Sequence, residues 1–334
     1  MFARLAVLAA LLSGCLPLHA ALQSAEGELE LLAARKPLEV AVRDRRIPAR
    51  VRALLARIPA VKRYGEANGL RATSNYEDYV QLHRSAVVYV VTACEPLRFN
   101  AKTWSFPIAG SFPYLGWFDK RSAQDYAHDL EGDGWDVDVR GASAYSTLGW
   151  FRDPVLSSMI PAGPEALGEL VNVVLHESVH ATLHLEGQST FNESLASFVA
   201  DRLTLRYLEK QRGAQPYRDA EARGRNALHE LHRGYEELDA LYKSQKSDAE
   251  KLTAKGEILL ALRERLQWKR RLNNASLMGH KTYSSGGQGF ARLLESCRED
   301  FGCFFGKLRT LRSDSFAKPQ EEDLDPVLLK LAGA

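Results

Sequence analysis

The chain has 334 residues, of which 45% are hydrophobic and 26% are charged, and its 44 basic side chains nearly balance its 42 acidic ones. These values are typical of a soluble globular protein with one large or two modest domains. They give no sign of a nucleic-acid partner, because the net charge is only +2 and no extended basic run is present.

Residues 1–20 predict an export signal rather than a part of the fold. Arg4 precedes an apolar run, Leu5 to Leu12, that is too short to span a bilayer. Leu12-Ser13-Gly14-Cys15 then looks like the cleavage box of bacterial lipoproteins, so we expect lipidation at Cys15. Cleavage after Ala20, which would release a soluble exported protein, is the alternative. The prediction is a protein in the periplasm of the bacterial cell envelope, anchored to the membrane by lipid.

Residues 21–160 predict an N-terminal α+β part. Apolar residues at helical spacing indicate helices, and unbroken or alternating runs of β-branched residues indicate strands. The expected elements are helices within 21–63, a buried strand at 87–93, a helix at 121–131, and strands at 135–140 and 142–150. The last strand contains Tyr145 and Ser146, which could pair with an extended peptide substrate.

Residues 161–315 predict a mainly helical part, followed by a flexible tail at 316–334. The first helix should begin after Pro164 and end at Gly187, a residue suited to a helix C-cap. The expected helices after it span 189–208, a long hairpin at 218–272 with its turn at 243–248, and two short helices near 287–298 and 303–312.

The cysteines predict one small disulfide. Cys297 and Cys303 are six residues apart, and an exported protein can oxidise such a pair. Two reduced cysteines on adjacent helices are the alternative. Cys94 should remain unpaired and buried.

The sequence His176-Glu177-Ser178-Val179-His180 has the pattern H-E-x-x-H within an apolar segment. Residues four apart lie on one face of a helix, so the two imidazoles can bind one Zn²⁺, and Glu177 can act as the base that takes a proton from water. An ordinary core helix with satisfied histidines is the alternative, but buried polar groups without partners are costly.

A catalytic zinc usually has three protein ligands, so a third is expected downstream. Glu193 lies on the next helix, and a turn between the helices would place it opposite the histidines. Glu186 is one rival, although a long histidine motif needs a glycine where this chain has Leu183. His184 is the other rival, but on an unbroken helix it lies two turns from His176.

Two further residues complete the predicted site. Tyr283 is the candidate donor to the oxyanion of peptide hydrolysis, with His280 as the alternative and a purely packing tyrosine as the simpler explanation. Asp201 lies eight residues after Glu193. Without binding the metal itself, it could contact a metal-ligating side chain and fix its orientation.

Several of these stretches carry a family resemblance. The chain resembles the predicted aminopeptidase family of bacterial lipoproteins, within the gluzincin-type metallopeptidases, over about residues 20–312. The shared stretches are Ala144–Gly149, His176–His180, Asn192-Glu193-x-x-Ala196 and Asn273-Asn274-Ala275, with Gln23–Leu32 also similar. The resemblance implies zinc at His176, His180 and Glu193, with Glu177 as catalytic base.

The strand from Gly141 to Thr147 departs from the well-studied gluzincin aminopeptidases, because it has no acidic residue to hold a free amine. We expect a zincin-like α+β fold in which a small mixed sheet covers the H-E-x-x-H helix. The predicted function is zinc-dependent peptide hydrolysis, by an aminopeptidase or an endopeptidase. The alternative is a non-catalytic, zinc-stabilised lipoprotein that binds cell-envelope material.

Overall fold

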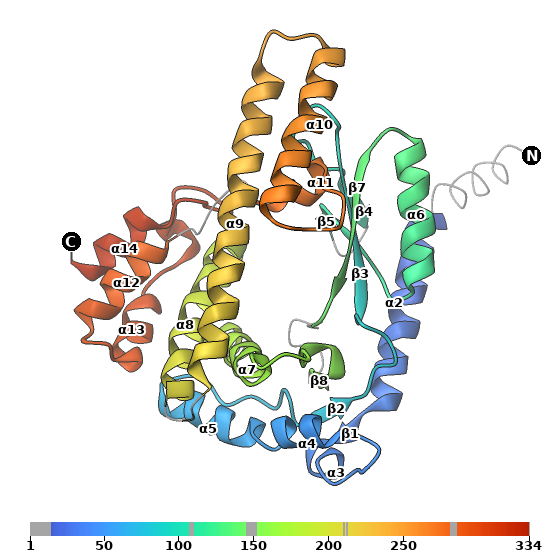
Figure 1. The fold of residues 1–334 in the computed structure, drawn as a ribbon. Coiled ribbons are helices and arrows are strands. Elements are labelled where there is room, and N and C mark those ends of the chain that lie inside the picture. Colours follow the sequence, from blue (N-terminus) through green and yellow to red (C-terminus); the bar gives the residue numbers. More distant parts are fainter. Residues whose placement is uncertain are drawn as a thin grey trace, which may run out of the picture. The chain divides into compact units, whose positions relative to one another are not determined.

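The computed structural model describes residues 15–106, 110–144, 152–209, 211, 213–280 and 286–333 (Figure 1). The chain divides into two compact units. The first lies within Met1–Arg35, Leu82–Tyr145 and Asn226–Lys281, and the second within Lys36–Gln81, Ser146–Arg225 and Thr282–Ala334. Each unit therefore contains residues from both parts predicted from the sequence, 21–160 and 161–315. Among the described helices, none combines the length and apolar character that crossing a membrane requires.

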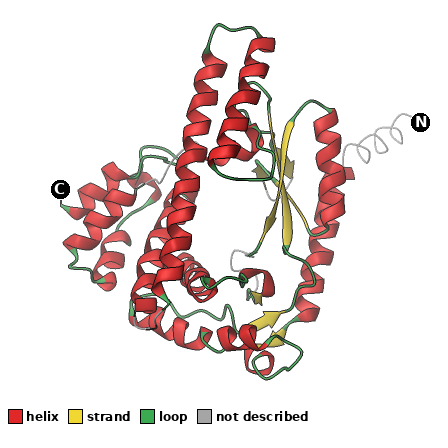
Figure 2. Cartoon of the chain, viewed as in Figure 1, coloured by secondary structure: helices red, strands yellow, loops and turns green. Residues whose placement is uncertain are grey.

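An antiparallel three-stranded sheet forms the centre of the first unit (Figure 2). Its strands, in spatial order, are β6 (Leu115–Trp117), β3 (Val88–Cys94) and β7 (Asp136–Ala142). Val91 of the central strand pairs with Leu115 on one side and with Val139 on the other. The strand is almost entirely buried, which explains its unbroken run of β-branched residues. The strands predicted at 87–93 and 135–140 are confirmed.

Two helices, α2 (Cys15–Ala34) and α6 (Lys120–Gly132), pack beside this sheet. The side chain of Gln23 donates to the carbonyl of Gly116 at 2.8 Å and accepts from the backbone N–H of Phe118 at 2.8 Å. Asp119 caps α6 by accepting from the backbone N–H of Ser122. A separate two-stranded ribbon is formed by β4 (Trp104–Phe106) and β5 (Gly110–Phe112).

The predicted helical hairpin is confirmed as α9 (Ala214–Lys243) and α10 (Asp248–Arg265), which run antiparallel in Figure 1. Ser247 begins α10 with a capping box, since its hydroxyl and the Glu250 side chain each bond the other's backbone N–H. Leu231, Leu238 and Leu262 form the buried seam between the two helices.

Polar contacts tie α10 and the short helix α11 (Asn274–Leu277) to the sheet edge. Lys255 is only 7% exposed, and its Nζ donates to Asp136 and to the carbonyl of Pro96. Asn274 donates to the carbonyl of Glu95 at 2.8 Å, and its backbone N–H donates to Asp136. A 3₁₀ turn, η2 (Met278–His280), follows α11. The asparagines of the 273–275 stretch thus have structural roles.

Between residues 36 and 209, the described part of the second unit contains five α-helices and a small mixed sheet. The helices are α3 (Leu38–Ala41), α4 (Ala49–Leu55), α5 (Ile58–Ala67), α7 (Ala166–Thr182) and α8 (Ser189–Glu209). The strands, in spatial order, are β1 (Lys36–Pro37), β2 (Asp78–Val80) and β8 (Val155–Leu156), and the 3₁₀ turn η1 (Ser157–Met159) follows them. The longer sheet belongs to the first unit and α7 to the second, so a sheet covering the H-E-x-x-H helix remains a prediction.

The C-terminal stretch of the second unit also folds. Its elements are α12 (Gly287–Ser296), α13 (Phe301–Leu308), η3 (Ser313–Ser315) and α14 (Asp325–Ala332). The predicted flexible tail therefore contains a helix. α14 packs on α12 because Gly289 has no side chain: a Cβ atom there would lie 2.6 Å from Leu328. Leu328 is fully buried as a result.

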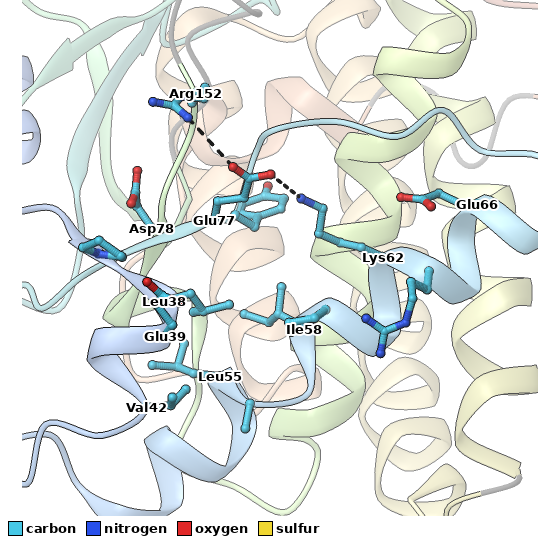
Figure 3. A pocket seen from close by; sticks show the side chains of 15 residues that line it. Leu38, Glu39, Val42, Leu55, Ile58, Lys62, Glu66, Glu77, Asp78 and Arg152 are labelled. Atoms are coloured by element: carbon cyan, nitrogen blue, oxygen red, sulfur yellow. Dashed lines mark ion pairs between the residues drawn. The ribbon is translucent and has the colours of Figure 1, made fainter.

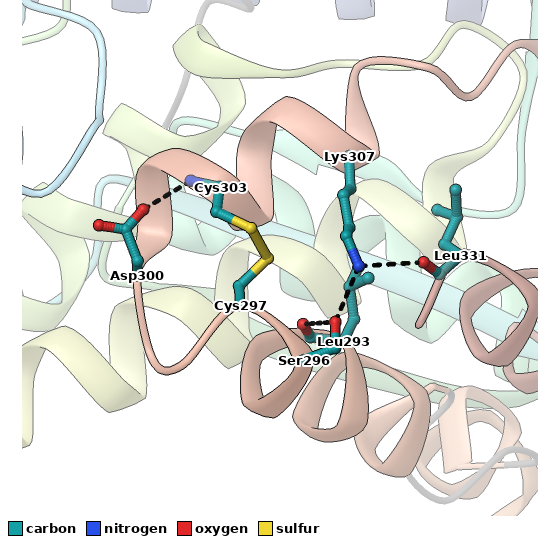
Figure 4. The surroundings of a disulfide bond; sticks show 7 residues. All are labelled: Leu293, Ser296, Cys297, Asp300, Cys303, Lys307 and Leu331. Carbon is teal, nitrogen blue, oxygen red and sulfur yellow. Dashed lines mark hydrogen bonds between the residues drawn. A yellow bond between two sulfur atoms is a disulfide. The ribbon is translucent and has the colours of Figure 1, made fainter. Parts of the chain in front are cut away.

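A disulfide joins Cys297 to Cys303 between α12 and α13 (Figure 4), as predicted. Asp300 caps α13 by accepting from the backbone N–H of Cys303, and Lys307 donates to Ser296 across the same turn. Cys94 is free and buried, also as predicted.

Replacing Cys297 and Cys303 together with serine is expected to lower the free energy of unfolding by about 2 kcal/mol, because the bridge restricts a short loop of the unfolded chain. Urea unfolding with and without a reducing agent measures this. The reductant should weaken the wild type and leave the double variant unchanged. Equal midpoints for all four samples would contradict the prediction.

Candidate metal centre

The helix α7 carries both histidines of the H-E-x-x-H pattern. Val171, Val174, Leu175 and Val179 are fully buried along one side of it and fix its orientation. His176 and His180 are one turn apart on another side, with side chains 21% and 22% exposed. The partly open face of a buried helix therefore presents both imidazoles.

The end of α7 differs from the prediction. The helix stops at Thr182, because Leu183 is extended with φ −148° and ψ 122°. Beyond it, the Asn192 side chain accepts from the backbone N–H of Leu185 at 2.9 Å and donates to its carbonyl at 2.8 Å. In a continuing helix, this N–H and this carbonyl would make backbone hydrogen bonds. Here both are bonded to the Asn192 side chain instead. The predicted continuation through His184 to Gly187 is therefore wrong.

The turn that follows leads the chain back along α7. Gly187 has φ 74°, a left-handed conformation that favours glycine. Gln188 is almost fully buried, and its side chain donates to the carbonyl of Lys318 and accepts from the backbone N–H of Glu321. α8 then packs closely against α7, with Phe191 and Leu195 fully buried. Glu193 thereby faces the histidine pair.

The three ligand candidates lie at short and nearly equal separations. The Nε2 atoms of His176 and His180 are 3.2 Å apart. The Glu193 oxygens lie 3.4 Å from the first of these atoms and 3.5 Å from the second. All the ligand atoms of this group fall within 4.8 Å of one another. Two ligand atoms on one tetrahedral zinc, each about 2.0–2.1 Å from it, would be about 3.3 Å apart. The group therefore fits a single zinc ion.

Hydrogen bonds and charges within this group shift the pKa values of Glu193 and His180. Hydrogen bonds from His176 and His180 hold the pKa of Glu193 well below its usual range. Burial disfavours the protonated form of His180, but the hydrogen bond and charge of Glu193 outweigh it and raise the pKa of His180. Glu193, whose side chain is 66% exposed, is thus available as an ionised ligand.

Glu177 is partly buried beside this group. Burial raises the pKa of its carboxyl, the two histidines oppose that shift, and the charges of Asp153 and Glu193 add to it. A carboxyl group shifted in this direction is better able to exchange a proton near neutral pH. Glu177 does not belong to the group of ligand candidates, which leaves its carboxylate available for such a role.

Asp201 lies behind the site in a small polar network. Its carboxylate accepts from the Asn172 side chain at 2.8 Å and from the Tyr217 hydroxyl at 3.3 Å. The charge of His176 acts on Asp201 without a direct hydrogen bond between the two side chains among the described contacts. Burial and the charge of Asp201 raise the pKa of Tyr217, so its hydroxyl stays protonated and can donate to Asp201, while Asn172 donates from a position one turn before His176. The role of Asp201 as support for a ligand remains a prediction.

The other candidates do not belong to this group of ligand atoms, or they lie outside the described residues. Glu186 and His184 are exposed on the turn and do not join the ligand group. His280 belongs to the first unit, where its carbonyl contacts His232 Nδ1 at 2.9 Å, and burial lowers its pKa to about 4. Tyr283, Tyr145 and Ser146 lie outside the described residues.

Sequence reasoning missed several residues near Glu177 and His176. Asp153 is only 4% exposed, and its charge acts on Glu177. Tyr76 is equally buried, and the charge of Glu177 acts on its phenol. Asn172 lies one turn before His176, a spacing that could have suggested it. Asp153 and Tyr76 are distant in sequence from the motif, so no local signal points to them.

Comparison with known proteins identifies the family. The family model described as "Putative aminopeptidase" matches residues 21–323. No curated protein and no solved structure gives a significant match. The match to the family model begins within α2, ends after η3, and includes all three ligand candidates and Glu177. The chain therefore belongs to this aminopeptidase family.

Proposed function

We propose that the protein is a zinc-dependent peptidase that acts on free N-termini of peptides. Membership of the aminopeptidase family supports peptide hydrolysis. The observation that carries the zinc dependence is the spacing of His176, His180 and Glu193, whose ligand atoms are separated by 3.2 to 3.5 Å. This spacing agrees with the about 3.3 Å expected around one tetrahedral ion.

His176 and His180 would bind the ion through Nε2, and Glu193 would bind it through its carboxylate. Bound zinc supplies a Lewis acid that polarises the scissile carbonyl and eases the deprotonation of water. Glu177 takes the proton of the attacking water and later delivers it to the leaving amine. Tyr283 remains the proposed donor to the oxyanion.

Three ligands favour a catalytic site over a structural one. A structural zinc is usually enclosed by four protein ligands, whereas a catalytic zinc has three and an open position. The group found among the described residues has three members. A structural zinc also has no use for a partly buried carboxyl such as Glu177 beside its ligands.

Peptide pairs that differ only at the N-terminus test the proposed function. Zinc-loaded protein should hydrolyse a peptide with a free amine faster than the same peptide with an acetylated amine. Equal rates would make the enzyme an endopeptidase. Absence of hydrolysis of either peptide, with zinc bound, would reject the peptidase proposal in favour of a zinc-stabilised binding protein.

We also propose that the protein is anchored at the periplasmic face of a membrane through Cys15. Replacing Cys15 with serine should move the protein from the membrane fraction to the soluble fraction and abolish incorporation of labelled fatty acid. Peptidase activity should be unchanged. Soluble wild-type protein beginning at Ala21 would contradict the anchor.

A further inference from the structure

The C-terminal segment 313–321 is attached to the turn between α7 and α8. The end of this turn, residues 186–189, makes hydrogen bonds to the segment. α8 begins there and carries the ligand candidate Glu193 about one turn later. Phe316 of the segment packs edge-on against Phe191, with 5.4 Å between the ring centroids, and both rings are buried. The segment therefore makes an apolar contact two residues before Glu193.

Gln188 makes the buried part of this attachment. Its side chain is almost fully buried, and both ends of its amide bond to the segment. Nε2 donates to the carbonyl of Lys318 at 3.0 Å, and Oε1 accepts from the backbone N–H of Glu321 at 3.0 Å. A buried amide without such partners would be costly. The carbonyl of Gln188 also accepts from the backbone N–H of Asn192 at 3.0 Å, which connects the attachment to the first turn of α8.

Gln320 makes the other part, at the first residue of α8. Its backbone N–H donates to the carbonyl of Gly187 at 2.9 Å, and its Oε1 accepts from the backbone N–H of Ser189 at 3.0 Å. The latter is one of the N–H groups that a helix N-terminus leaves without an intrahelical partner. Gln320 has φ 53°, in the left-handed region, which is uncommon for a residue other than glycine. Such a conformation persists only where the surroundings fix it, and it is frequent at functional sites.

These hydrogen bonds join residues 187–189 to residues 318–321, and we call this contact the clasp. Because the backbone bonds of a helix make it rigid over one turn, the place where α8 begins decides where Glu193 lies. The Glu193 oxygens lie 3.4 Å from Nε2 of His176 and 3.5 Å from Nε2 of His180. Zinc–ligand distances tolerate deviations of only about 0.2 Å, so a small displacement of the helix start would weaken the site.

We propose that Gln188 and Gln320 are positioning residues for Glu193. The clasp fixes the start of α8 and holds the Glu193 carboxylate where it can share one zinc ion with the two histidines. This inference rests on the proposed function, because it concerns a ligand of the proposed zinc ion. Neither glutamine belongs to the group of ligand candidates, so both act through Glu193. Since coupling between two sites is reciprocal, bound zinc must also stabilise the clasp.

Two substitutions in the clasp should weaken zinc binding. Gln188→Met and Gln320→Met keep the approximate size of each side chain and remove its hydrogen bonds. Each should raise the Kd for zinc about 10-fold, the lower end of the effect of substituting residues that support a metal ligand. Competition with a chromophoric chelator measures this Kd. Excess zinc should restore kcat to the wild-type value, because the ligands themselves are intact.

Two further variants separate the clasp from a general loss of stability. Gln320→Glu should keep the wild-type Kd, because a carboxylate oxygen still accepts from Ser189 and is favoured at a helix N-terminus. Asp325→Ala is the matched control, since Asp325 accepts from the backbone N–H of Gly289 at 3.0 Å in the first turn of α12, outside the clasp. It should also keep the wild-type Kd. Equal increases in Asp325→Ala and the methionine variants, or wild-type Kd in both methionine variants, would overturn the inference.

A control in another part of the second unit is Glu77. Figure 3 shows it between Lys62 and Arg152, on the wall of a cavity of about 690 Å³. Its carboxylate lies 3.6 Å from Lys62 and 3.8 Å from Arg152. None of the residues that line this cavity belongs to the clasp. Glu77→Gln should therefore leave the Kd for zinc unchanged, and an increase as large as in the methionine variants would overturn the inference.

Hydrogen exchange of the wild-type protein tests the clasp without any substitution. The backbone N–H groups of Gln320 and Glu321 donate across the clasp, so zinc should slow exchange at 318–321 by the same factor of about 10. Exchange at 287–291 should not change. If the zinc-loaded wild type hydrolyses no peptide, the proposed function fails while the zinc affinities and the exchange rates still decide the role of the clasp. Unchanged exchange at 318–321, or no zinc binding at all, would overturn the inference.

Discussion

Replacing Glu177 with glutamine is expected to lower kcat for peptide hydrolysis by at least about 10²-fold, the lower bound for a positioned general base. Glutamine keeps the size of the side chain and removes its basicity. Glu177 is not among the ligand candidates, so zinc content and the unfolding midpoint should remain close to those of the wild type. Steady-state kinetics on zinc-loaded protein, with metal analysis of the same sample, measures both quantities.

Glu169→Gln is the matched control for this experiment. Glu169 lies on the same helix, two turns earlier, and burial likewise raises the pKa of its carboxyl. Its replacement should leave kcat unchanged, because it is not next to the ligand group. Equal activity of the zinc-loaded Glu177→Gln variant and the wild type would mean that another group takes the proton of the water.

Replacing Glu193 with glutamine should empty the metal site. Glutamine has no negative charge and is a poor ligand for zinc beside two neutral imidazoles. Substitution of residues that only support a ligand already weakens metal binding about 10–100-fold, so loss of a ligand should weaken it at least as much. Zinc occupancy after dialysis and peptidase activity should fall together.

Glu186→Gln is the control for the third ligand. Glu186 is exposed on the turn after α7 and was the rival for this role. The variant should keep both its zinc and its activity. Full zinc occupancy in Glu193→Gln together with an empty site in Glu186→Gln would reverse the assignment.

The fold was predictable where the spacing of hydrophobic residues in the sequence matches the residues that are buried in the structure. The run at 87–93 forms β3, and the heptad-like leucines form the α9–α10 hairpin. The end of α7 was not predictable, because it depends on a bond from Asn192 to the backbone of Leu185 across the turn. Gly187 was predicted to end α7 as a C-cap glycine, but the helix stops at Thr182, five residues before it.

The candidate site was predictable only in part. The four-residue spacing of His176 and His180 places them on one face of any helix, and Glu193 lies opposite them after a turn of ordinary length. The left-handed conformation of Tyr76 has no sequence signal, because its backbone N–H donates to the carbonyl of Asp153, which is distant in the chain.

Stepwise addition of zinc to metal-free protein tests the central claim most directly. Peptide hydrolysis should be absent without metal, rise in proportion to added zinc, and reach its maximum at about one zinc per chain, as three ligands of this kind predict. Parallel titration of Glu193→Gln should show no such end point. Full hydrolysis in the metal-free wild-type protein, or none after one equivalent of zinc is bound, would contradict the account.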